Sequence, residues 1–280
     1  MQRDLLCGLE GEFGQRHCSR CGLYFLSPRV PESRIGEYYP NSYGPYQQNG
    51  DAPLVRKAAS LLGLEQRRRN IVERCLPAGN GSSRRILDVG CGAGDFLELL
   101  SDGPWERYAM DVARHTGGSF TGPFHEGRFD HSAPPFPCMD AITLWHVFEH
   151  LYHPRIALRN AAALLKPGGR LFLAIPDLRC MERALFGRFW VGWDPPRHVA
   201  TYSHRGIKEL LEEAGLKLVR VVPDACSSSL LALNIEFVLR STGRHRNVQN
   251  SFFLKLLLYP LVFLSISLGL APAKVYVAEK

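Results

Sequence analysis

The first 14 residues, MQRDLLCGLEGEFG, lack the continuous apolar core that a signal peptide requires, because acids and glycines interrupt them. A protein without an export signal is expected in the cytoplasm, where reducing conditions disfavour disulfides. The eight cysteines of the 280-residue chain are therefore predicted to be free thiols or metal ligands. Its 45% hydrophobic and 22% charged residues are ordinary for a globular protein and exclude global disorder.

Acidic residues are scarce in the C-terminal part of the chain. Between Phe237 and Lys280, six basic residues are opposed only by Glu279, so this segment carries five of the seven net positive charges. The simplest interpretation is a solvated face; an anionic membrane surface or an anionic substrate is the alternative. No nucleic acid partner is expected, because the positive charge is not interleaved with aromatic residues in a recognised binding motif.

The chain also lacks an uninterrupted apolar segment of membrane-spanning length. The most apolar stretch, 252–270, is close to that length, but Lys255 and Pro260 interrupt it. We expect a helix at a membrane interface, or a hydrophobic cap packed on the sheet, rather than a true span. In the first case residues 237–272 would make a peripheral contact with the inner face of the membrane.

Short apolar segments alternate with helical segments from Arg85 onward, which predicts an α/β fold with a mostly parallel, doubly wound sheet. The first 50 residues, rich in Gly, Pro, Tyr and Cys, are expected to form a small module with a linker, and 51–280 the main domain. A helical period covers 54–76. The expected strands are 86–89, 108–110, 141–145, 170–176, 216–222 and 274–279, and further helices are expected at 156–165 and 206–214.

The central signal is a glycine loop within Ile86–Leu97, in which a strand, a turn and a helix follow one another. Its glycines let the backbone turn sharply and let a ligand approach without a Cβ in the way. In open α/β sheets, ligands bind in the crevice at the carboxyl ends of the strands. The candidate ligand-binding residues of this loop are Asp88, Gly90, Cys91, Gly92 and Gly94.

A second carboxylate supports a nucleoside ligand. Asp111 follows Gly94 by 17 residues and ends the next expected strand, where it can accept both hydroxyls of a ribose. This also suits NAD, but a dinucleotide loop has G-x-G-x-x-G, whereas this loop has G-x-G-x-G after an acid. Asp88 is badly placed for a phosphate and well placed for the ammonium group of a methionine moiety, so the pattern favours S-adenosylmethionine.

Several ordered motifs then carry a family resemblance. ILDVGCGAGDF resembles the cofactor loop of class I S-adenosylmethionine-dependent methyltransferases. MDAITLWHVFEHLYHP, LLKPGGRLFLAIPD and DPPRHVATYSHRGIKELLEEAGL resemble the fourth strand, the fifth strand and a downstream segment of the branch that includes ubiquinone-biosynthesis-type and methyltransferase-23-like enzymes. CSRCGLYFLSPRVPESRIGEYYPNSY resembles the N-terminal cysteine module attached to that branch.

The resemblance implies a Rossmann-like, seven-stranded sheet whose last hairpin is reversed. The segment between the two hairpin strands, at about 225–272, would then be an apolar insertion. It also implies that Asp130, Leu144 and Trp145 lie beside the cofactor. One departure is visible, because the segment after Asp111 is short and glycine-rich where the family has a full helix.

Two histidines are candidate general bases for a methyl acceptor that must lose a proton. His146 follows the fourth strand, and His198 lies in a segment that could form a substrate lid with Trp190 and Trp193. The alternative is that these histidines orient loops or line the cofactor site. The pattern His146-x-x-Glu149-His150 also matches inverted zinc proteases, but it starts at a strand end rather than in a long helix. A divalent cation on Glu149 and His150 is a weaker alternative.

The N-terminal cysteines resemble a damaged zinc knuckle. Cys18-x-x-Cys21 is one half. The other half reads Asp4-x-x-Cys7, with aspartate at the expected first cysteine. Cys7, Cys18 and Cys21 could hold Zn²⁺ with Asp4 or His17 as the fourth ligand; a metal-free module is the alternative.

Three functions follow from these observations. The leading one is an S-adenosylmethionine-dependent transferase that methylates a small-molecule, lipid-linked or glycan acceptor; oxygen is the expected methylated atom, and carbon or nitrogen is the alternative. The second is a non-catalytic S-adenosylmethionine-binding scaffold associated with a membrane through the C-terminal segment. The third, a nicotinamide oxidoreductase, predicts NAD binding instead. Retention of Asp88, the loop glycines and Asp111 argues against a dead cofactor pocket.

Overall fold

The computed structural model describes residues 2–40, 66–77, 83–115, 118, 120–224, 228–243, 248 and 251–280, without the side chains of 228, 229 and 252. The expected linker around 41–53, the first part of the helix expected at 54–76, and Cys226 lie outside the described residues. The chain divides into two compact units. The sheet unit is Leu62–Ile175, His204–Val222 and Val275–Lys280, and the accessory unit is Met1–Leu61, Pro176–Ser203 and Pro223–Lys274.

A seven-stranded sheet forms the centre of the sheet unit, as the sequence predicts. Its four pairings from β5 to β7 are parallel. The central strands are buried on both sides, which explains their near-continuous apolar sequences. The strand order is β5 (Phe124–Glu126), β4 (Trp105–Asp111), β3 (Arg84–Val89), β6 (Met139–Trp145), β7 (Leu165–Pro176), β10 (Ala273–Glu279) and β9 (Lys217–Pro223).

The last hairpin of the sheet is reversed. Gly168 at the start of β7 donates to the carbonyl of Lys280 at the end of β10, and Asp177 after β7 donates to Pro272 before β10. These two bonds make β10 antiparallel to β7. The chain leaves β9 beside the start of β10, where the amide of Asp224 donates to Ala273. The predicted sheet with its reversed hairpin is therefore confirmed.

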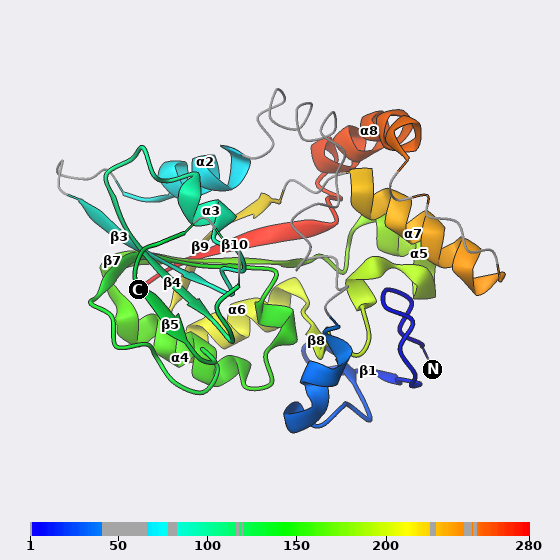
Figure 1. Cartoon of the computed structure of the whole chain (residues 1–280), viewed down its shortest axis with the longest axis horizontal. Helices are drawn as coiled ribbons and strands as arrows, with labels where there is room; N and C mark the ends of the chain where they lie inside the picture. Colours follow the sequence, from blue (N-terminus) through cyan, green and yellow to red (C-terminus); the bar gives the residue numbers. More distant parts are fainter. Residues whose placement is uncertain are drawn as a thin grey trace. The chain divides into compact units, whose positions relative to one another are not determined.

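Helices cover both faces of this sheet (Figure 1). Two of them, α2 (Gln66–Cys75) and the one-turn α3 (Asp95–Glu98), lie on one face, and α4 (Pro154–Leu164) and α6 (His204–Glu213) lie on the other. The core beneath α2 and α3 contains Val72, Ile86, Leu97 and Phe172. The helix α4 begins with a proline at its first turn and buries the apolar face that includes Ala157, Ala161 and Leu164.

The accessory unit contains a second, antiparallel sheet of three short strands, β1 (Gln15–His17), β2 (Tyr24–Leu26) and β8 (Ala200–Thr201). A small core of Leu178, Cys180, Trp190 and Trp193 packs against Tyr24. The other elements of this unit are η1 (Glu32–Tyr38), α5 (Met181–Phe186), η4 (Gly187–Phe189), η5 (Val191–Trp193), α7 (Ser228–Ser241) and α8 (Phe252–Ser267).

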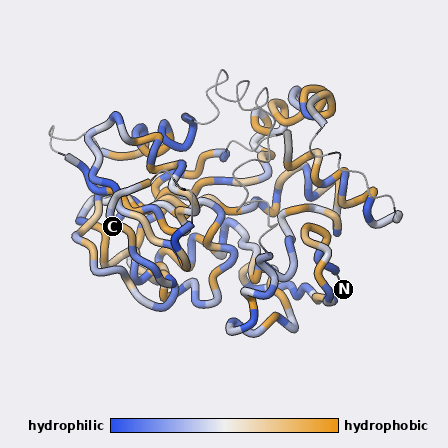
Figure 2. The backbone as a smooth tube through the Cα atoms, viewed as in Figure 1, coloured by the Kyte–Doolittle hydropathy of each residue, from blue (hydrophilic) through white to orange (hydrophobic). Residues whose placement is uncertain are grey.

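The apolar segment between β9 and β10 folds as the helix pair α7 and α8. The tube along α8 is mostly hydrophobic (Figure 2). Large apolar side chains on α8 are nonetheless exposed, among them Phe253 at 80% and Leu257 at 76%, whereas Lys255 and Ser265 are buried. Within the described part of the chain, no helix combines the length and the apolar character that crossing a membrane requires.

Candidate functional site

The glycine loop follows β3 at the centre of the parallel sheet. Gly90, Gly92 and Gly94 all have positive φ, at 70°, 54° and 87°. The amide of Gly90 donates to the carbonyl of Met110 on the neighbouring strand over 2.7 Å, and that of Gly94 donates to Cys91 within the loop over 2.9 Å. These bonds hold the turn that the sequence predicts, although the helix after it, α3, has only four residues.

The three glycines face different surroundings. A Cβ added at Gly90 would lie 2.3 Å from Cγ2 of Val147, and one at Gly94 would lie 2.4 Å from Cβ of Phe120. Both positions are closed by protein atoms. A Cβ at Gly92 would meet nothing within 4 Å. The loop therefore presents open space at Gly92, where a ligand can approach the backbone.

Asp111 ends β4 and reaches the glycine loop. Its Oδ2 accepts the amide of Gly92 over 2.8 Å, and its Oδ1 accepts the amide of Val112 over 2.7 Å. Burial raises the pKa of this carboxyl, and the two backbone bonds act in the opposite direction. Each oxygen keeps a further lone pair, so the fixed carboxylate can still accept hydroxyl groups of a ribose.

Asp88 is buried at the end of β3, with 2% of its surface exposed. Burial raises its pKa to about 7, against the opposing effect of the hydrogen bond from Thr143, whose hydroxyl donates to Oδ1 over 2.6 Å. The positive charge of Arg68 also acts against the rise, but burial outweighs it. A ligand that brings an ammonium group would stabilise the buried anion further.

Leu144 and Trp145 end β6 beside β3, where Leu144 is paired with Val89. Both side chains are buried. The ring of Trp145 lies 5.2 Å from that of Phe96 at an edge angle, and the guanidinium of Arg68 lies 4.9 Å from the Trp145 ring centre. Leu144 and Trp145 thus form an apolar wall at the end of the strand.

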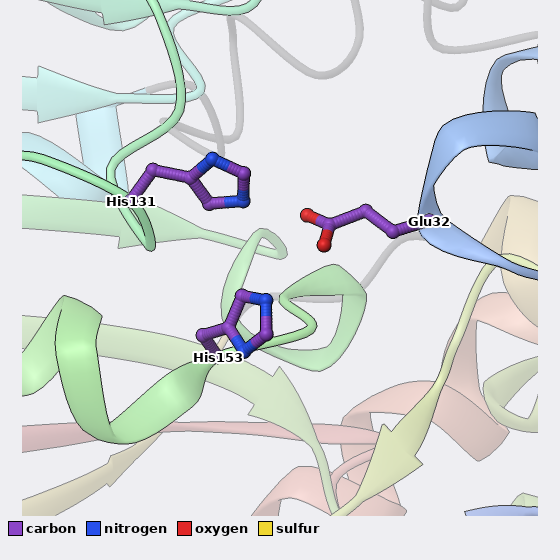
Figure 3. Close-up of side chains that lie close together, drawn as sticks. All are labelled: Glu32, His131 and His153. Carbon is purple, nitrogen blue, oxygen red and sulfur yellow. The ribbon is translucent and has the colours of Figure 1, made fainter.

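Asp130 is fully buried and organises the loop before α4. Its Oδ2 accepts the amides of Tyr152 and His153 over 2.9 and 3.1 Å, and Nη2 of Arg128 over 3.2 Å. These bonds join two loops, and the rings of His131 and His153 lie near each other beside them, with centroids 5.5 Å apart (Figure 3). Its second oxygen, Oδ1, accepts no hydrogen bond from the described residues. The role of Asp130 at the adenine remains a prediction.

His146 sits at the turn directly after β6, with a positive φ of 57°. Its amide donates to Ala174 on β7 over 3.0 Å. Its Nδ1 lies 3.4 Å from Oε1 of Glu149, a carboxylate with no exposed surface, whereas the histidine side chain is 32% exposed. Its neighbour Val147 packs against Gly90 of the glycine loop. A half-exposed imidazole backed by a buried carboxylate is suited to accept a proton on Nε2.

His198 belongs to the accessory unit. Its Nδ1 lies 2.9 Å from the carbonyl of Gly192, which fixes a proton on that nitrogen in the neutral ring and leaves Nε2 as the acceptor. Trp190 and Trp193, predicted to form a lid with this histidine, are buried in the core of the same unit. Both histidines thus keep the tautomer of a general base, and the structure places them in different compact units.

The family model described as "Methyltransferase domain" matches residues 63–221, which include the whole of this site. The chain belongs to this family. The predicted family, the methyltransferases, is therefore confirmed, and the nicotinamide alternative is not supported.

Curated relatives of this methyltransferase are named as O-methyltransferases. It is 31% identical over 102 residues to the ubiquinone biosynthesis O-methyltransferase of Vibrio vulnificus, an alignment that covers 32% of this chain and 43% of the relative. It is 27% identical over 184 residues to the O-methyltransferase cnsE of Penicillium expansum, with 60% and 63% covered. The chain thus spans about half the length of the curated relatives it matches.

The fold of this methyltransferase is shared with solved structures. Magnesium protoporphyrin IX methyltransferase of Synechocystis, solved with bound S-adenosylhomocysteine, matches with a TM-score of 0.53. The match covers 89% of this chain and all of that one, at 14% identity. The structural likeness therefore supports the Rossmann-like fold.

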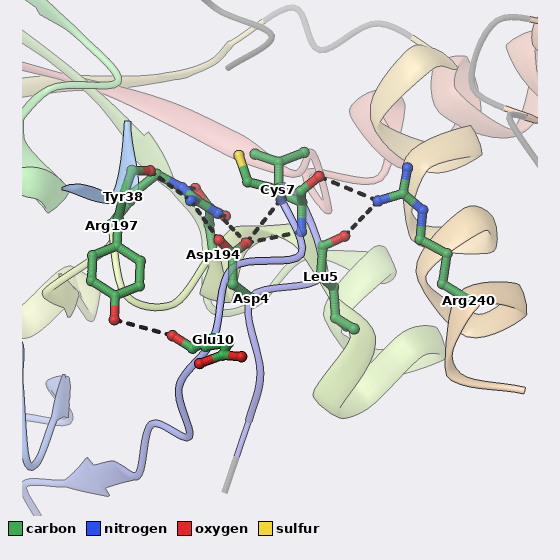
Figure 4. A network of polar contacts seen from close by, with 9 residues as sticks. Asp4, Leu5, Cys7, Glu10, Tyr38, Asp194, Arg197 and Arg240 are labelled. Atoms are coloured by element: carbon green, nitrogen blue, oxygen red, sulfur yellow. Dashed lines mark hydrogen bonds and ion pairs between the residues drawn. The ribbon is translucent and has the colours of Figure 1, made fainter. Parts of the chain in front are cut away.

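The N-terminal module of the methyltransferase holds Asp4 in an ion cluster (Figure 4). Arg197, with no exposed surface, donates to both oxygens of Asp4 over 2.6 and 3.0 Å and to both oxygens of Asp194 over 2.6 and 2.9 Å. It also donates to the carbonyl of Tyr38. Burial opposes the charge of Arg197, but these carboxylates outweigh it and raise its pKa. Asp4 is thus already neutralised by an arginine, which makes it a poor fourth zinc ligand.

The cysteines near this cluster are free thiols. Hydrogen bonds from the backbone and side chain of Cys21 lower the pKa of Cys18, so these two lie together. Among the described residues, the groups of three or more side chains close enough to share a metal ion include neither cysteine nor Cys7. The zinc site on Cys7, Cys18 and Cys21 gains no support from this arrangement and remains a prediction.

Some residues of the site are not in the predicted set. Thr143 is a polar residue within the apolar strand Ala-Ile-Thr-Leu-Trp and is paired with Asp88 across the parallel register. A threonine in such a strand is a signal that a buried polar partner must exist. Phe120 and Val147, which close Gly94 and Gly90, carry no such signal, because only the folded loops bring them there.

Proposed function

We propose that this chain transfers a methyl group from S-adenosylmethionine to an oxygen of its acceptor, with His146 as the general base. The observation that carries the proposal is the juxtaposition of the glycine loop with the His146 turn. Val147 closes Gly90, and Glu149 lies 3.4 Å from the imidazole. The names of the curated relatives support oxygen as the methylated atom.

Each part of the cofactor is assigned to a different set of residues. Asp88 binds the ammonium group of the methionine moiety, since its buried carboxylate is ionised most readily beside a cation. Asp111 accepts the ribose hydroxyls, and the open space at Gly92 admits the backbone of the ligand. Leu144 and Trp145 supply apolar contacts at the end of β6, and Asp130 is the candidate at the adenine.

The reaction is an in-line displacement at the methyl carbon. The acceptor oxygen forms the new C–O bond while the bond from carbon to the sulfonium sulfur breaks, and the electron pair of that bond stays on sulfur. The acceptor hydroxyl gives its proton to Nε2 of His146, and the buried carboxylate of Glu149 stabilises the resulting imidazolium. Alignment of the two reactants supplies much of the rate gain.

Calorimetric titration tests the cofactor, and release of S-adenosylhomocysteine with a panel of phenols, sugars and lipid alcohols tests the chemistry. We expect S-adenosylmethionine to bind and His146→Gln to bind it equally well while turning over about 100-fold more slowly. Absence of binding would overturn the assignment. Binding without turnover of any acceptor in the panel would instead favour the non-catalytic scaffold.

A lipid-linked acceptor is the finer proposal, and the surface of α8 supports it. The exposed side chains Phe253, Leu256, Leu257, Phe263 and Leu264 recur at helical spacing and form one apolar stripe. Large exposed apolar patches mark protein or membrane contact sites. No acid occurs between residues 237 and 278, whereas five basic residues do, so the segment is compatible with an anionic bilayer.

Co-sedimentation with phosphatidylglycerol vesicles at low salt tests this contact. Wild-type protein should pellet with the vesicles, and Leu256→Glu with Leu257→Glu should stay in the supernatant. The matched control is Leu185→Glu, which changes a leucine on α5 that is also 62% exposed. A wild type that ignores the vesicles, or equal binding by all three proteins, would remove the membrane part of the proposal.

A further inference from the structure

A groove of about 730 Å³ lies wholly within the accessory unit, and none of its lining residues is assigned to the cofactor. Its walls come from the second residue of the chain, β1 and the segment 178–193. They include Gln2, Arg179, Arg183, Arg188 and Trp193. The volume is that of a small-molecule site.

The charge of this groove is of one sign. Three arginines line it and no carboxylate does. Within the described part of the chain, none of Arg179, Arg183 and Arg188 forms an ion pair. The acid next to the groove, Glu182, is 1% exposed, and burial raises the pKa of its carboxyl, which limits the negative charge it adds. The groove therefore attracts an anion.

Arg183 is held in place before any ligand arrives. Its Nη1 donates to the carbonyl of Leu178 over 2.7 Å, and its Nη2 donates to the hydroxyl of Tyr24 over 3.2 Å. Its guanidinium also lies 5.3 Å and 5.4 Å from the ring centres of Tyr24 and Trp193. A guanidinium has five N–H donors, so this fixed group retains donors for a planar or tetrahedral anion.

A neutral polar group in the same lining indicates a second feature of the ligand. Gln2 is partly exposed in this lining, and its side-chain amide can both donate and accept hydrogen bonds. A hydroxyl is a suitable partner for such an amide, so a suitable ligand carries both an anionic group and a hydroxyl.

We propose that this groove binds a hydroxyl-bearing phosphorylated compound, such as a sugar phosphate. Its phosphate contacts the three arginines, and a hydroxyl forms a hydrogen bond with the side-chain amide of Gln2. Phosphate suits the groove because arginine binds its oxygens in pairs. The same group could come from a soluble compound or from the head of a phospholipid, and the experiment separates the two.

Titration of the full-length protein with glucose 6-phosphate, inorganic phosphate and glucose tests the proposal, beside sedimentation with phosphatidylglycerol and phosphatidylcholine vesicles. We expect glucose 6-phosphate to bind more tightly than phosphate, and glucose not to bind. Arg179→Gln with Arg188→Gln should weaken binding at least tenfold, and Gln2→Leu should abolish the preference for glucose 6-phosphate over phosphate. The matched control is Arg16→Gln, an exposed arginine of β1 outside the lining.

Unchanged thermal unfolding and unchanged S-adenosylmethionine affinity in each variant would show that only the groove is altered. Absence of binding by all phosphate probes, or equal binding by the variants, would overturn the proposal. Binding to phosphatidylglycerol vesicles alone, lost in the arginine variants, would assign the phosphate to a lipid head group and overturn the soluble ligand.

Discussion

Replacement of Asp88 by asparagine separates the effect of this residue on folding stability from its effect on cofactor binding. Asp88 is 2% exposed, and burial raises the pKa of its carboxyl to about 7 from an ordinary value of 3.8. Asparagine has nearly the same shape but cannot ionise. The variant therefore removes the buried charge and leaves a side chain that Thr143 can still contact.

The magnitude follows from the linkage between proton binding and folding. Because the folded protein holds this proton more tightly than the unfolded chain, ionisation of Asp88 destabilises the fold as the pH rises from about 4 to about 7. A difference of about three pH units, at about 1.4 kcal/mol each, gives a cost of about 4 kcal/mol above pH 7. Asp88→Asn should escape this cost, so the ligand-free variant is more stable than wild type at pH 8 and equal to it near pH 4.

Cofactor binding should change in the opposite direction. Loss of a charge-assisted hydrogen bond to the ammonium group costs about 1.5–3 kcal/mol, or about 10- to 100-fold in affinity. Urea unfolding between pH 5 and pH 8, with and without S-adenosylmethionine, measures both effects. The control is Asp102→Asn, which alters an exposed carboxylate outside the site. A variant that keeps the wild-type decline in stability with pH, or its affinity for the cofactor, would refute the reasoning.

Three further predictions test other parts of the structure. Glu149→Gln should lower turnover about tenfold and move the acid limb of the pH–rate profile to lower pH, since the neighbouring imidazolium loses its carboxylate; an unmoved limb would contradict this role. Arg197→Met leaves two buried carboxylates unpaired and should lower the free energy of unfolding in urea by about 3–5 kcal/mol, and a loss below about 1 kcal/mol would show that the cluster is dispensable. Gly94→Ala combines positive φ with a 2.4 Å clash and should weaken cofactor binding in calorimetry. Its control, Gly168→Ala, has positive φ and open space, so it should destabilise the fold by about 1–2 kcal/mol without changing cofactor affinity. Equal cofactor affinities of the two variants would show that the close contact at Gly94 does not shape the cofactor site.

The sheet could be predicted because its signals are local. Each strand carries its own apolar run, and the glycine loop marks where β3 ends. The length of α3 could not be predicted, since FLELL has the composition of a longer helix. In the structure the helical backbone stops after one turn, where Leu100 becomes a fully buried member of the core. Tertiary packing rather than propensity decides that boundary.

The contacts around the N-terminal module could not be predicted from the sequence because their residues are far apart in the chain. Asp4 and Arg197 are 193 residues apart, and neither position carries a pattern that names the other. In the sequence, Asp4 stands where a zinc knuckle has a cysteine, so the pattern predicts a zinc ligand. In the structure, Asp4 forms an ion pair with Arg197. A buried arginine and buried carboxylates are each destabilising unless they neutralise one another. Only the folded structure shows that Arg197, Asp4 and Asp194 do so.

The backbone of His146 bears directly on the choice of general base. His146 and Asp194 are the non-glycine residues with positive φ in the described part of the chain. The strain at Asp194 is offset by its ion pair with Arg197. At His146, glycine would adopt the same φ without steric cost, so the backbone alone gives no reason for a side chain there. What the imidazole adds is its contact with the buried Glu149, beside a turn that closes the cofactor loop. A positive φ beside a ligand site supports the proposal that His146 acts as the general base.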